Sequence, residues 1–460
     1  MKLPFPCGQI ARRKFLFEAG LGFFGTAMGY LWSQERDRAD LRLPGKAPAK
    51  SVIFLFMCGG VSHIDTFDPK DNKLAGKMIE AVGFGDNMAK MLRPVIPCHR
   101  TFKQYGKSGI PVSDWFPHTG GVIDNIAVVR SMFCHETNHS PAVIEMATGH
   151  RDRFADHPTL GAWASYALGT ANQNLPTFVH MGRPSSTTQL NGGYLGATYS
   201  ATPFRAGDTP IDNLVPPKGL SRTERDEQMK TLMELNREFR ERYTIDAEVS
   251  ARLKSYQLAA RMQMEAPGVV DLSSEPKHVL DMYGIGQTDT DAFGRQLLLS
   301  RRLAEKGVRF IQVCHAGGGN GSWDAHSDMA SHEPLCKQVD KPISGLISDL
   351  KQRGMLDNTL VVFASEFGRS PWSQNTKGRD HNPRGFTSWL AGGGVKAGIV
   401  HGATDDVGYH AVESRHYISD LQATILHQMG IDHTKMTFAV NSRPIKLVEE
   451  GFGPIKEILL

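Results

Sequence analysis

The sequence has 460 residues, enough for one large α/β domain with insertions or for two domains, because a single core stops growing near roughly 250–300 residues. Its composition, 40% hydrophobic and 22% charged, is that of an ordinary globular protein and excludes a chain that is disordered throughout. The net charge is only +4, and no long basic run with interleaved aromatic residues occurs, so nucleic acid is not an expected partner.

Residues 1–32 carry the pattern of a twin-arginine export signal. Arg12 and Arg13 precede a Lys-Phe-Leu triplet and then an apolar stretch rich in Gly, Ala and Phe. Glu18 interrupts this stretch, which makes it too short for a comfortable membrane-spanning helix. We therefore expect the twin-arginine machinery to export the protein to the periplasm or another extracytoplasmic location. The alternative is an amphipathic N-terminal helix packed on the domain.

The expected export route has two consequences. The twin-arginine machinery moves folded proteins, so a metal could be inserted in the cytoplasm before export. No clear Ala-x-Ala cleavage site follows the apolar stretch, and an uncleaved segment would be the only expected contact with a membrane.

The rest of the chain divides into a linker and one large domain. Residues 33–50 are charged and then rich in Pro, Ala and Lys, which predicts a linker. The domain is expected over residues 51–460, with an inserted helical cap at about 191–283, where long polar helices replace the apolar runs. The charged helix faces of this cap are expected either to face solvent or to cover a substrate.

Short continuous apolar runs predict strands that are buried on both faces. These runs lie at residues 51–57, 125–130, 176–180, 308–314 and 359–364. Amphipathic stretches at 291–306 and 341–353 precede the last two runs, and residues 417–430 have helical spacing with a glycine at the end. This alternation predicts an α/β fold with a mostly parallel central sheet and helices on both faces.

Polar side chains follow four of the predicted strands. They include Asp65 and Asp68, His135 and His139, Asp324 and His326, and Glu366, Arg369, Arg379 and His381. Ligands of open α/β sheets bind at the carboxyl ends of the strands, so we expect these groups to line one site. Carboxylate together with imidazole is the donor combination that divalent zinc, manganese or iron prefers, although any one of these residues alone could simply anchor a loop.

Three separated motifs carry a family resemblance. They are Gly-Gly-Val-Ser-His-Ile-Asp65, Glu366-Phe-Gly-Arg369 and Gly-Arg-Asp-His381. With the twin-arginine pattern, they resemble domain of unknown function 1501, a sulfatase-like branch of the alkaline phosphatase superfamily. The resemblance implies an alkaline-phosphatase-like fold and a divalent metal, with zinc, manganese, calcium and iron not distinguished. It also implies hydrolysis of phosphate or sulfate esters of small molecules or glycans, and its metal ligands would be Asp65, Asp324, His326, Glu366 and His381.

The resemblance has two departures. Counting back from the Thr148-Gly149 pair places His139 at the family's nucleophile position and Ser140 one residue beyond it. Phe367 stands where the family has a metal-binding histidine. The catalytic candidates are therefore Ser140 as nucleophile at a helix N-terminus, His139 as nucleophile, acid/base or metal ligand, or water activated by the metal.

The anion-binding candidate is Arg369, with Arg379 beside it, and a structural ion pair is the alternative role for each. The predicted function is that of an exported metal-dependent hydrolase with an altered nucleophile site. The alternative is an exported binding protein without activity on the same scaffold, with anionic glycans as ligands. The sequence has no Cys-x-Pro-x-Arg or Ser-x-Pro-x-Arg motif, which argues against ordinary sulfatase chemistry.

Overall fold

A computed structural model describes residues 41–45, 47–82, 90–151, 156–205, 265–373, 377–440 and 443–460, with short helical pieces between 223 and 262. The predicted export signal at 1–32 lies outside the described residues, as do residues 33–40 of the predicted linker and much of the predicted cap at 191–283. These boundaries stay predictions. Among the described helices, none is long and apolar enough to cross a membrane.

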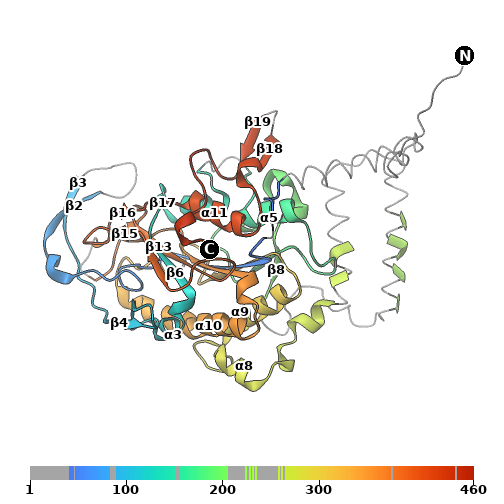
Figure 1. The fold of residues 1–460 in the computed structure, drawn as a ribbon, viewed down its shortest axis with the longest axis horizontal. Helices are drawn as coiled ribbons and strands as arrows, with labels where there is room; N and C mark the ends of the chain where they lie inside the picture. The colour runs from blue at the N-terminus through green and yellow to red at the C-terminus, as the bar shows by residue number, and fades with distance from the viewer. Residues whose placement is uncertain are drawn as a thin grey trace, which may run out of the picture.

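A nine-stranded sheet forms the centre of the molecule (Figure 1). Its strands are β1 (Ser51–Met57), β6 (Ile126–Phe133), β7 (Phe178–Met181), β8 (Thr202–Phe204), β9 (Phe310–His315), β10 (Thr359–Ala364), β13 (Phe386–Ala391), β14 (Ile399–His401) and β17 (His416–Tyr417). The order is β14-β6-β13-β10-β1-β9-β7-β8, and β17 also pairs with β6. All pairings are parallel except those of β13, which runs antiparallel to both neighbours. The predicted mostly parallel sheet is confirmed.

Helices cover both faces of this sheet. They are α3 (Pro117–Gly121), α4 (His139–Thr148), α5 (Leu160–Leu168), α8 (Lys277–Met282), α9 (Asp291–Glu305), α10 (His332–Gln352) and α11 (Ile418–Gln428). Every residue of β1 is buried, and successive side chains enter two different cores, as the two-residue period of a strand requires. One core contains Ile53 and Leu55 with α9 and α10, and the other contains Phe54 with α4, α5 and α11.

The predicted helix at 341–353 begins earlier than expected. α10 starts at His332 and continues through Pro342. A proline is favoured at the first helical position and disfavoured inside a helix, so the sequence pattern placed the start beside Pro342. β13 was not predicted, because its central residues Thr387 and Ser388 interrupt the apolar run although both are buried.

In the part of the chain that the structure describes, five two-stranded ribbons surround the sheet. They are β2 (Met78–Val82) with β3 (Lys90–Pro94), β4 (Phe102–Tyr105) with β5 (Ile110–Ser113), β11 (Gly368–Arg369) with β12 (His381–Asn382), β15 (Ala403–Thr404) with β16 (Ala411–Glu413), and β18 (Thr437–Val440) with β19 (Arg443–Lys446). In the β11–β12 ribbon Arg369 is the register partner of His381. This ribbon brings two of the sequence motifs into direct contact.

Part of the predicted linker packs on the domain. The Leu43 N–H donates to the Gly430 carbonyl at 2.8 Å, and the Ala49 N–H donates to the Gln428 carbonyl at 2.9 Å. The described residues between 41 and 50 are therefore attached to the end of α11, at the amino end of β1.

Candidate metal centre

The carboxyl ends of several parallel strands meet at one edge of the sheet, and the candidate site is built there. His139 begins α4 after β6, Asp324 and His326 follow β9, and Glu366 follows β10. His381 precedes β13, which runs in the opposite direction, so it reaches the same edge. The topology thus gathers residues from four separate chain segments.

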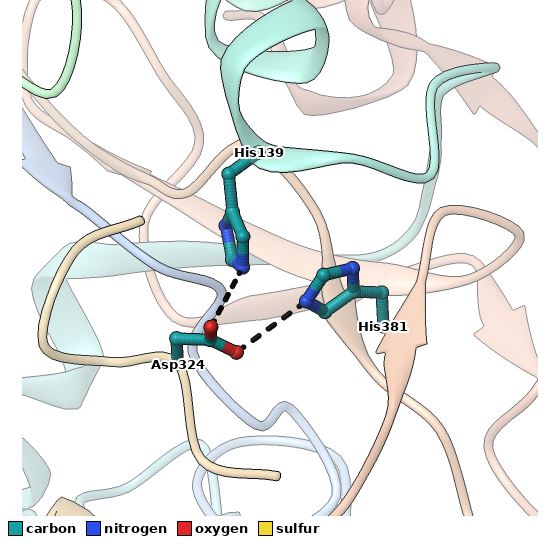
Figure 2. A group of neighbouring side chains, drawn as sticks. All are labelled: His139, Asp324 and His381. Carbon is teal, nitrogen blue, oxygen red and sulfur yellow. Dashed lines mark hydrogen bonds and ion pairs between the residues drawn. The ribbon is translucent and has the colours of Figure 1, made fainter. Parts of the chain in front are cut away.

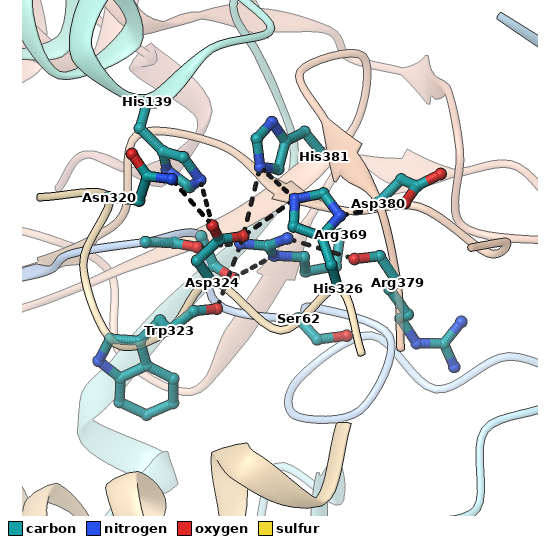
Figure 3. Close-up of polar contacts among 12 residues, drawn as sticks. Ser62, His139, Asn320, Trp323, Asp324, His326, Arg369, Arg379, Asp380 and His381 are labelled. Carbon is teal, nitrogen blue, oxygen red and sulfur yellow. Dashed lines mark hydrogen bonds and ion pairs between the residues drawn. The ribbon is translucent and has the colours of Figure 1, made fainter. Parts of the chain in front are cut away.

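Three imidazoles surround the carboxylate of Asp324 (Figure 3), and Figure 2 shows the two from His139 and His381. Asp324 Oδ2 lies 3.3 Å from His139 Nε2, and Asp324 Oδ1 lies 3.1 Å from His326 Nε2 and 3.4 Å from His381 Nε2. The Nε2 atoms of His326 and His381 are 2.9 Å apart. We call His139, Asp324, His326 and His381 the Asp324 cluster.

The outer nitrogen of each imidazole faces an oxygen acceptor. His139 Nδ1 lies 2.7 Å from Glu366 Oε1, His326 Nδ1 lies 3.1 Å from Asp380 Oδ1, and His381 Nδ1 lies 2.6 Å from the Thr137 carbonyl. Each Nδ1 must carry a proton to make this contact, so a neutral imidazole presents the Nε2 lone pair to the interior of the cluster. Metal-binding histidines are held by the same kind of outer contact.

Burial and the close contacts between these side chains determine the protonation states in the Asp324 cluster. Burial would raise the pKa of Asp324, but its contacts with His139, His326 and His381 hold the pKa well below its usual range. Hydrogen bonds to Asp324 and Asp380 raise the pKa of His326 to about 9, whereas burial lowers the pKa of His381 to about 4. Without a cation, His326 therefore carries the proton that lies between the two close Nε2 atoms. A divalent cation would replace that proton.

The donor set fits a metal ion. Three imidazole nitrogens and a carboxylate oxygen match the four-coordinate preference of zinc and also suit iron or manganese. Calcium prefers six to eight oxygen ligands and matches the set less well. His139, Asp324 and His381 have ligand atoms that all lie within 4.8 Å of one another.

Glu366 was predicted as a metal ligand, and the structure places it behind His139 instead. Glu366 is completely buried. Its Oε1 accepts from His139 Nδ1, and its carboxylate also accepts from the Gly59 N–H, at 2.9 Å to Oε1 and 3.1 Å to Oε2, and from Ser365 Oγ at 3.1 Å. These contacts occupy the carboxylate, so Glu366 orients a candidate ligand and is not itself in the Asp324 cluster.

Asp65, the other predicted acidic ligand, is not brought into the cluster. Arg379 Nε donates to Asp65 Oδ2 at 2.7 Å, and Ser62 Oγ donates to the same oxygen. Burial would raise the pKa of Asp65, but the Arg379 guanidinium outweighs it and the pKa is lowered. Asp65 and Arg379 form a buried ion pair, which was the structural alternative for Arg379.

Arg369 was predicted as a catalytic anion clamp, and its donors are already used (Figure 3). The side chain is completely buried, and its nitrogens donate to the carbonyl oxygens of Gly59, Gly60, Trp323 and Arg379. Arg369 Nη2 also donates to Asp324 Oδ1 at 2.8 Å. Arg369 therefore positions Asp324 and is not free to bind an anion.

Ser140 and Phe367 complete the set of residues singled out in the sequence. Ser140 is exposed in the first turn of α4, and no contact that holds the Asp324 cluster together involves it. The Phe367 ring packs against the rings of His139 and His381, with centroids 4.9 and 4.5 Å apart. The Phe367 ring therefore supports two of the imidazoles. It supplies no metal-binding atom at the position where the family has a histidine.

Two supporting features were not predicted as parts of the site. Asp380 anchors His326, and its position beside His381 in the Gly-Arg-Asp-His motif is a signal that could have identified it. Gly59 has φ +117°, and a Cβ there would lie 2.7 Å from the Asp324 nitrogen and 2.8 Å from the Trp323 nitrogen. Only glycine lets the end of β1 approach the loop that carries Asp324 this closely.

The fold and the site define a mostly parallel α/β protein with a candidate divalent-metal centre at the carboxyl ends of its strands. The family model described as "Protein of unknown function (DUF1501)" matches residues 49–459. The chain therefore belongs to the DUF1501 family. A search of curated proteins found no match.

Several solved structures are similar to this chain. The PsFucS1 sulfatase from Pseudoalteromonas sp. is 14% identical, with 87% of this chain and 72% of that chain covered and a TM-score of 0.37. The lipoteichoic acid synthase LtaP from Listeria monocytogenes is 8% identical, with 86% and 78% covered and a TM-score of 0.34. The alkaline phosphatase from the Antarctic bacterium TAB5 is 13% identical, with 84% and 99% covered and a TM-score of 0.36.

Proposed function

We propose that this protein is an exported, divalent-metal-dependent hydrolase of phosphate or sulfate esters. The observation that carries the proposal is the convergence of three anchored imidazoles on the Asp324 carboxylate. Uncompensated clustering of ionisable groups in a protein interior is costly, so such a set is expected where a cation binds it.

The exposure of the cluster supports a catalytic centre over a closed structural one. The side chain of His326 is 32% exposed and that of Asp324 is 14% exposed, whereas His139 is only 4% exposed. Solvent and a substrate can therefore reach one side of the cluster. Catalytic zinc sites keep an accessible position and can expand to five ligands, so a substrate oxygen would be an additional ligand on this exposed side of the cluster.

Each residue of the site has a defined task in this proposal. His139, Asp324, His326 and His381 would hold the metal, which when bound polarises an ester oxygen and stabilises charge on the leaving oxygen. Glu366, Asp380 and the Thr137 carbonyl fix the imidazole tautomers, and Arg369 fixes the Asp324 carboxylate.

The nucleophile that we propose is Ser140. It directly follows His139 in the first turn of α4, where backbone N–H groups of the helix start have no intrahelical partners. Those groups favour the negative charge of a phosphoryl or sulfuryl group. The expected substrates are small-molecule or glycan esters.

A second candidate function is that of a non-catalytic binding protein for anionic glycans. The observation in its favour is that Arg369 and Arg379 are both occupied by protein acceptors and that Ser140 takes no part in the cluster. In this case the metal centre would bind a ligand without turnover.

Metal analysis of the purified full-length protein combined with turnover of aryl phosphates and aryl sulfates separates the two functions. Bound metal together with turnover that Asp324→Asn abolishes supports the hydrolase. Bound metal without turnover on either ester class supports the binding protein. Protein that takes up no divalent metal would refute both metal-dependent functions.

A further inference from the structure

A second group of metal-type side chains lies at the edge of the sheet, outside the Asp324 cluster. β14 and β17 both pair in parallel with the outer edge of β6 and follow one another along it. His401 is opposite Val129 and His416 is opposite Met132. His401, the last residue of β14, therefore meets His416, the first residue of β17.

The two imidazoles meet through their Nε2 atoms. His401 Nε2 lies 2.9 Å from His416 Nε2, with ring centroids 5.0 Å apart. His416 Nδ1 lies 3.4 Å from Asp420 Oδ2, an acid in the first turn of α11. This contact places the proton of a neutral His416 on Nδ1 and directs its Nε2 lone pair toward His401.

A carboxylate from a third segment completes the group. Glu457 lies in the short 3₁₀ helix η10 (Lys456–Ile458) close to the C-terminus. Its carboxylate and the nitrogens of His401 and His416 have ligand atoms that all lie within 4.8 Å of one another. Lys396 holds η10 against the sheet, with Nζ donating to the Glu457 carbonyl at 2.9 Å and its N–H donating to the Ile458 carbonyl at 2.8 Å.

We propose that His401, His416 and Glu457 form a second divalent-cation site, of the zinc class, that fastens the C-terminal segment to the edge of the sheet. Two imidazoles and one carboxylate are a common zinc donor set, with water in the remaining position. The competing explanation is a plain hydrogen bond in which His401 Nε2–H donates to His416 Nε2. In that case no metal binds and Glu457 is merely solvated.

The site shares no residue with the Asp324 cluster, so stoichiometry tests it. The full-length protein is stripped of metal and titrated with zinc by calorimetry. Four proteins are compared: the wild type, Asp324→Asn, His416→Gln and the double variant Asp324→Asn/His416→Gln. We expect the Asp324→Asn variant to retain one equivalent of bound zinc and the double variant to lose it. His410→Gln in the Asp324→Asn background is the matched control, because His410 is an exposed histidine of the neighbouring β15–β16 turn.

The melting temperature is a second measurement, and it distinguishes a lost zinc site from a variant that does not fold. Zinc at 100 times its Kd stabilises a protein by about 2.7 kcal/mol, so it should raise the Tm of Asp324→Asn. The rise should vanish in Asp324→Asn/Glu457→Gln, whose substitution is in a surface side chain. The inference is overturned if Asp324→Asn binds no zinc, or if it binds zinc equally with and without the His416 or Glu457 substitution. A wild type that binds zinc only through His416 would refute the Asp324 centre and leave this inference standing.

Discussion

His326 Nε2 and His381 Nε2 lie 2.9 Å apart, and both nitrogens also face the same carboxylate oxygen of Asp324. Since the Nδ1 atoms of both rings are held by oxygen acceptors, neither ring can turn its protonated side inward without losing that contact. A positive charge at the centre relieves this arrangement. The charge is a proton in the metal-free protein, and we propose a divalent cation in the active one.

Replacing the carboxylate at the centre should remove the metal. Asp324→Asn keeps the shape of the side chain and loses the negative charge that the three imidazoles face. We expect the metal content of the purified protein to fall by about one equivalent and ester hydrolysis to be lost, while the far-ultraviolet circular dichroism stays unchanged. Asp406→Asn, at an exposed position, is the control. Undiminished metal content in Asp324→Asn would refute the centre.

The carboxylate behind His139 should tune the metal affinity. Glu366→Gln keeps one oxygen acceptor for His139 Nδ1, whereas Glu366→Ala leaves that nitrogen and the Gly59 N–H without acceptors. Outer partners of metal ligands typically contribute 10–100-fold in affinity. We expect Glu366→Ala to weaken zinc binding by about that factor and Glu366→Gln to weaken it less, as measured by competition with a chelating dye. Equal affinities in the three proteins would show that Glu366 has no positioning role.

We expect the buried guanidinium of Arg369 to contribute to the free energy of unfolding and not to substrate binding. Arg369→Lys cannot supply the donors that now satisfy four carbonyl oxygens and Asp324. A buried acceptor without a donor costs about 1–3 kcal/mol, so chemical denaturation should show a clear loss of unfolding free energy. Arg415→Lys, at an exposed position, is expected to be neutral. An anion clamp predicts the opposite pattern, namely a raised KM at unchanged stability.

Ser140→Ala tests the nucleophile. Because the Ser140 side chain makes none of the contacts that hold the cluster, we expect the variant to keep its metal content and to lose ester hydrolysis. The comparison uses metal analysis and initial rates on the same preparation. Retained hydrolysis would exclude Ser140 and leave water as the attacking group.

The predicted export signal can be tested without an assay of activity. Changing Arg12 and Arg13 together to Lys should retain the protein in the cytoplasm, because the twin-arginine machinery requires the arginine pair. Fractionation of the native host followed by immunoblotting measures the distribution, and Lys14→Arg is the control. An unchanged distribution would contradict the proposed route.

The sequence predicts the buried strands that are continuous apolar runs and misses a buried strand that contains polar residues. The strands β1 and β10 have the predicted bounds because each is a continuous apolar run with every residue buried. β13 is equally central, yet Thr387 and Ser388 conceal it, since their burial depends on packing that no local pattern shows.

The site was predictable as a collection of residue types and not as a set of contacts. His139, Asp324, His326 and His381 were all singled out, because imidazoles and acids follow the strand ends. Asp65 fits the same local pattern, but its partner Arg379 lies 314 residues away in the sequence. Which acid faces the imidazoles and which one faces a guanidinium is decided by the folded chain.

The pairing of Arg369 with His381 in the β11–β12 ribbon determines how the centre would respond to cations of different radius. His381 is fixed by this ladder and His139 by the start of α4, so the distance between these two donors is set by the backbone. Asp324 and His326 sit on the glycine-rich loop after β9, where Gly318, Gly319 and Gly321 adopt positive φ. Adaptation to a larger or smaller ion should therefore occur on that loop. Gly319 is the position to substitute, because a Cβ there would meet no atom within 4 Å, whereas a Cβ at Gly321 would lie 2.1 Å from the Cys58 carbonyl oxygen at the end of β1.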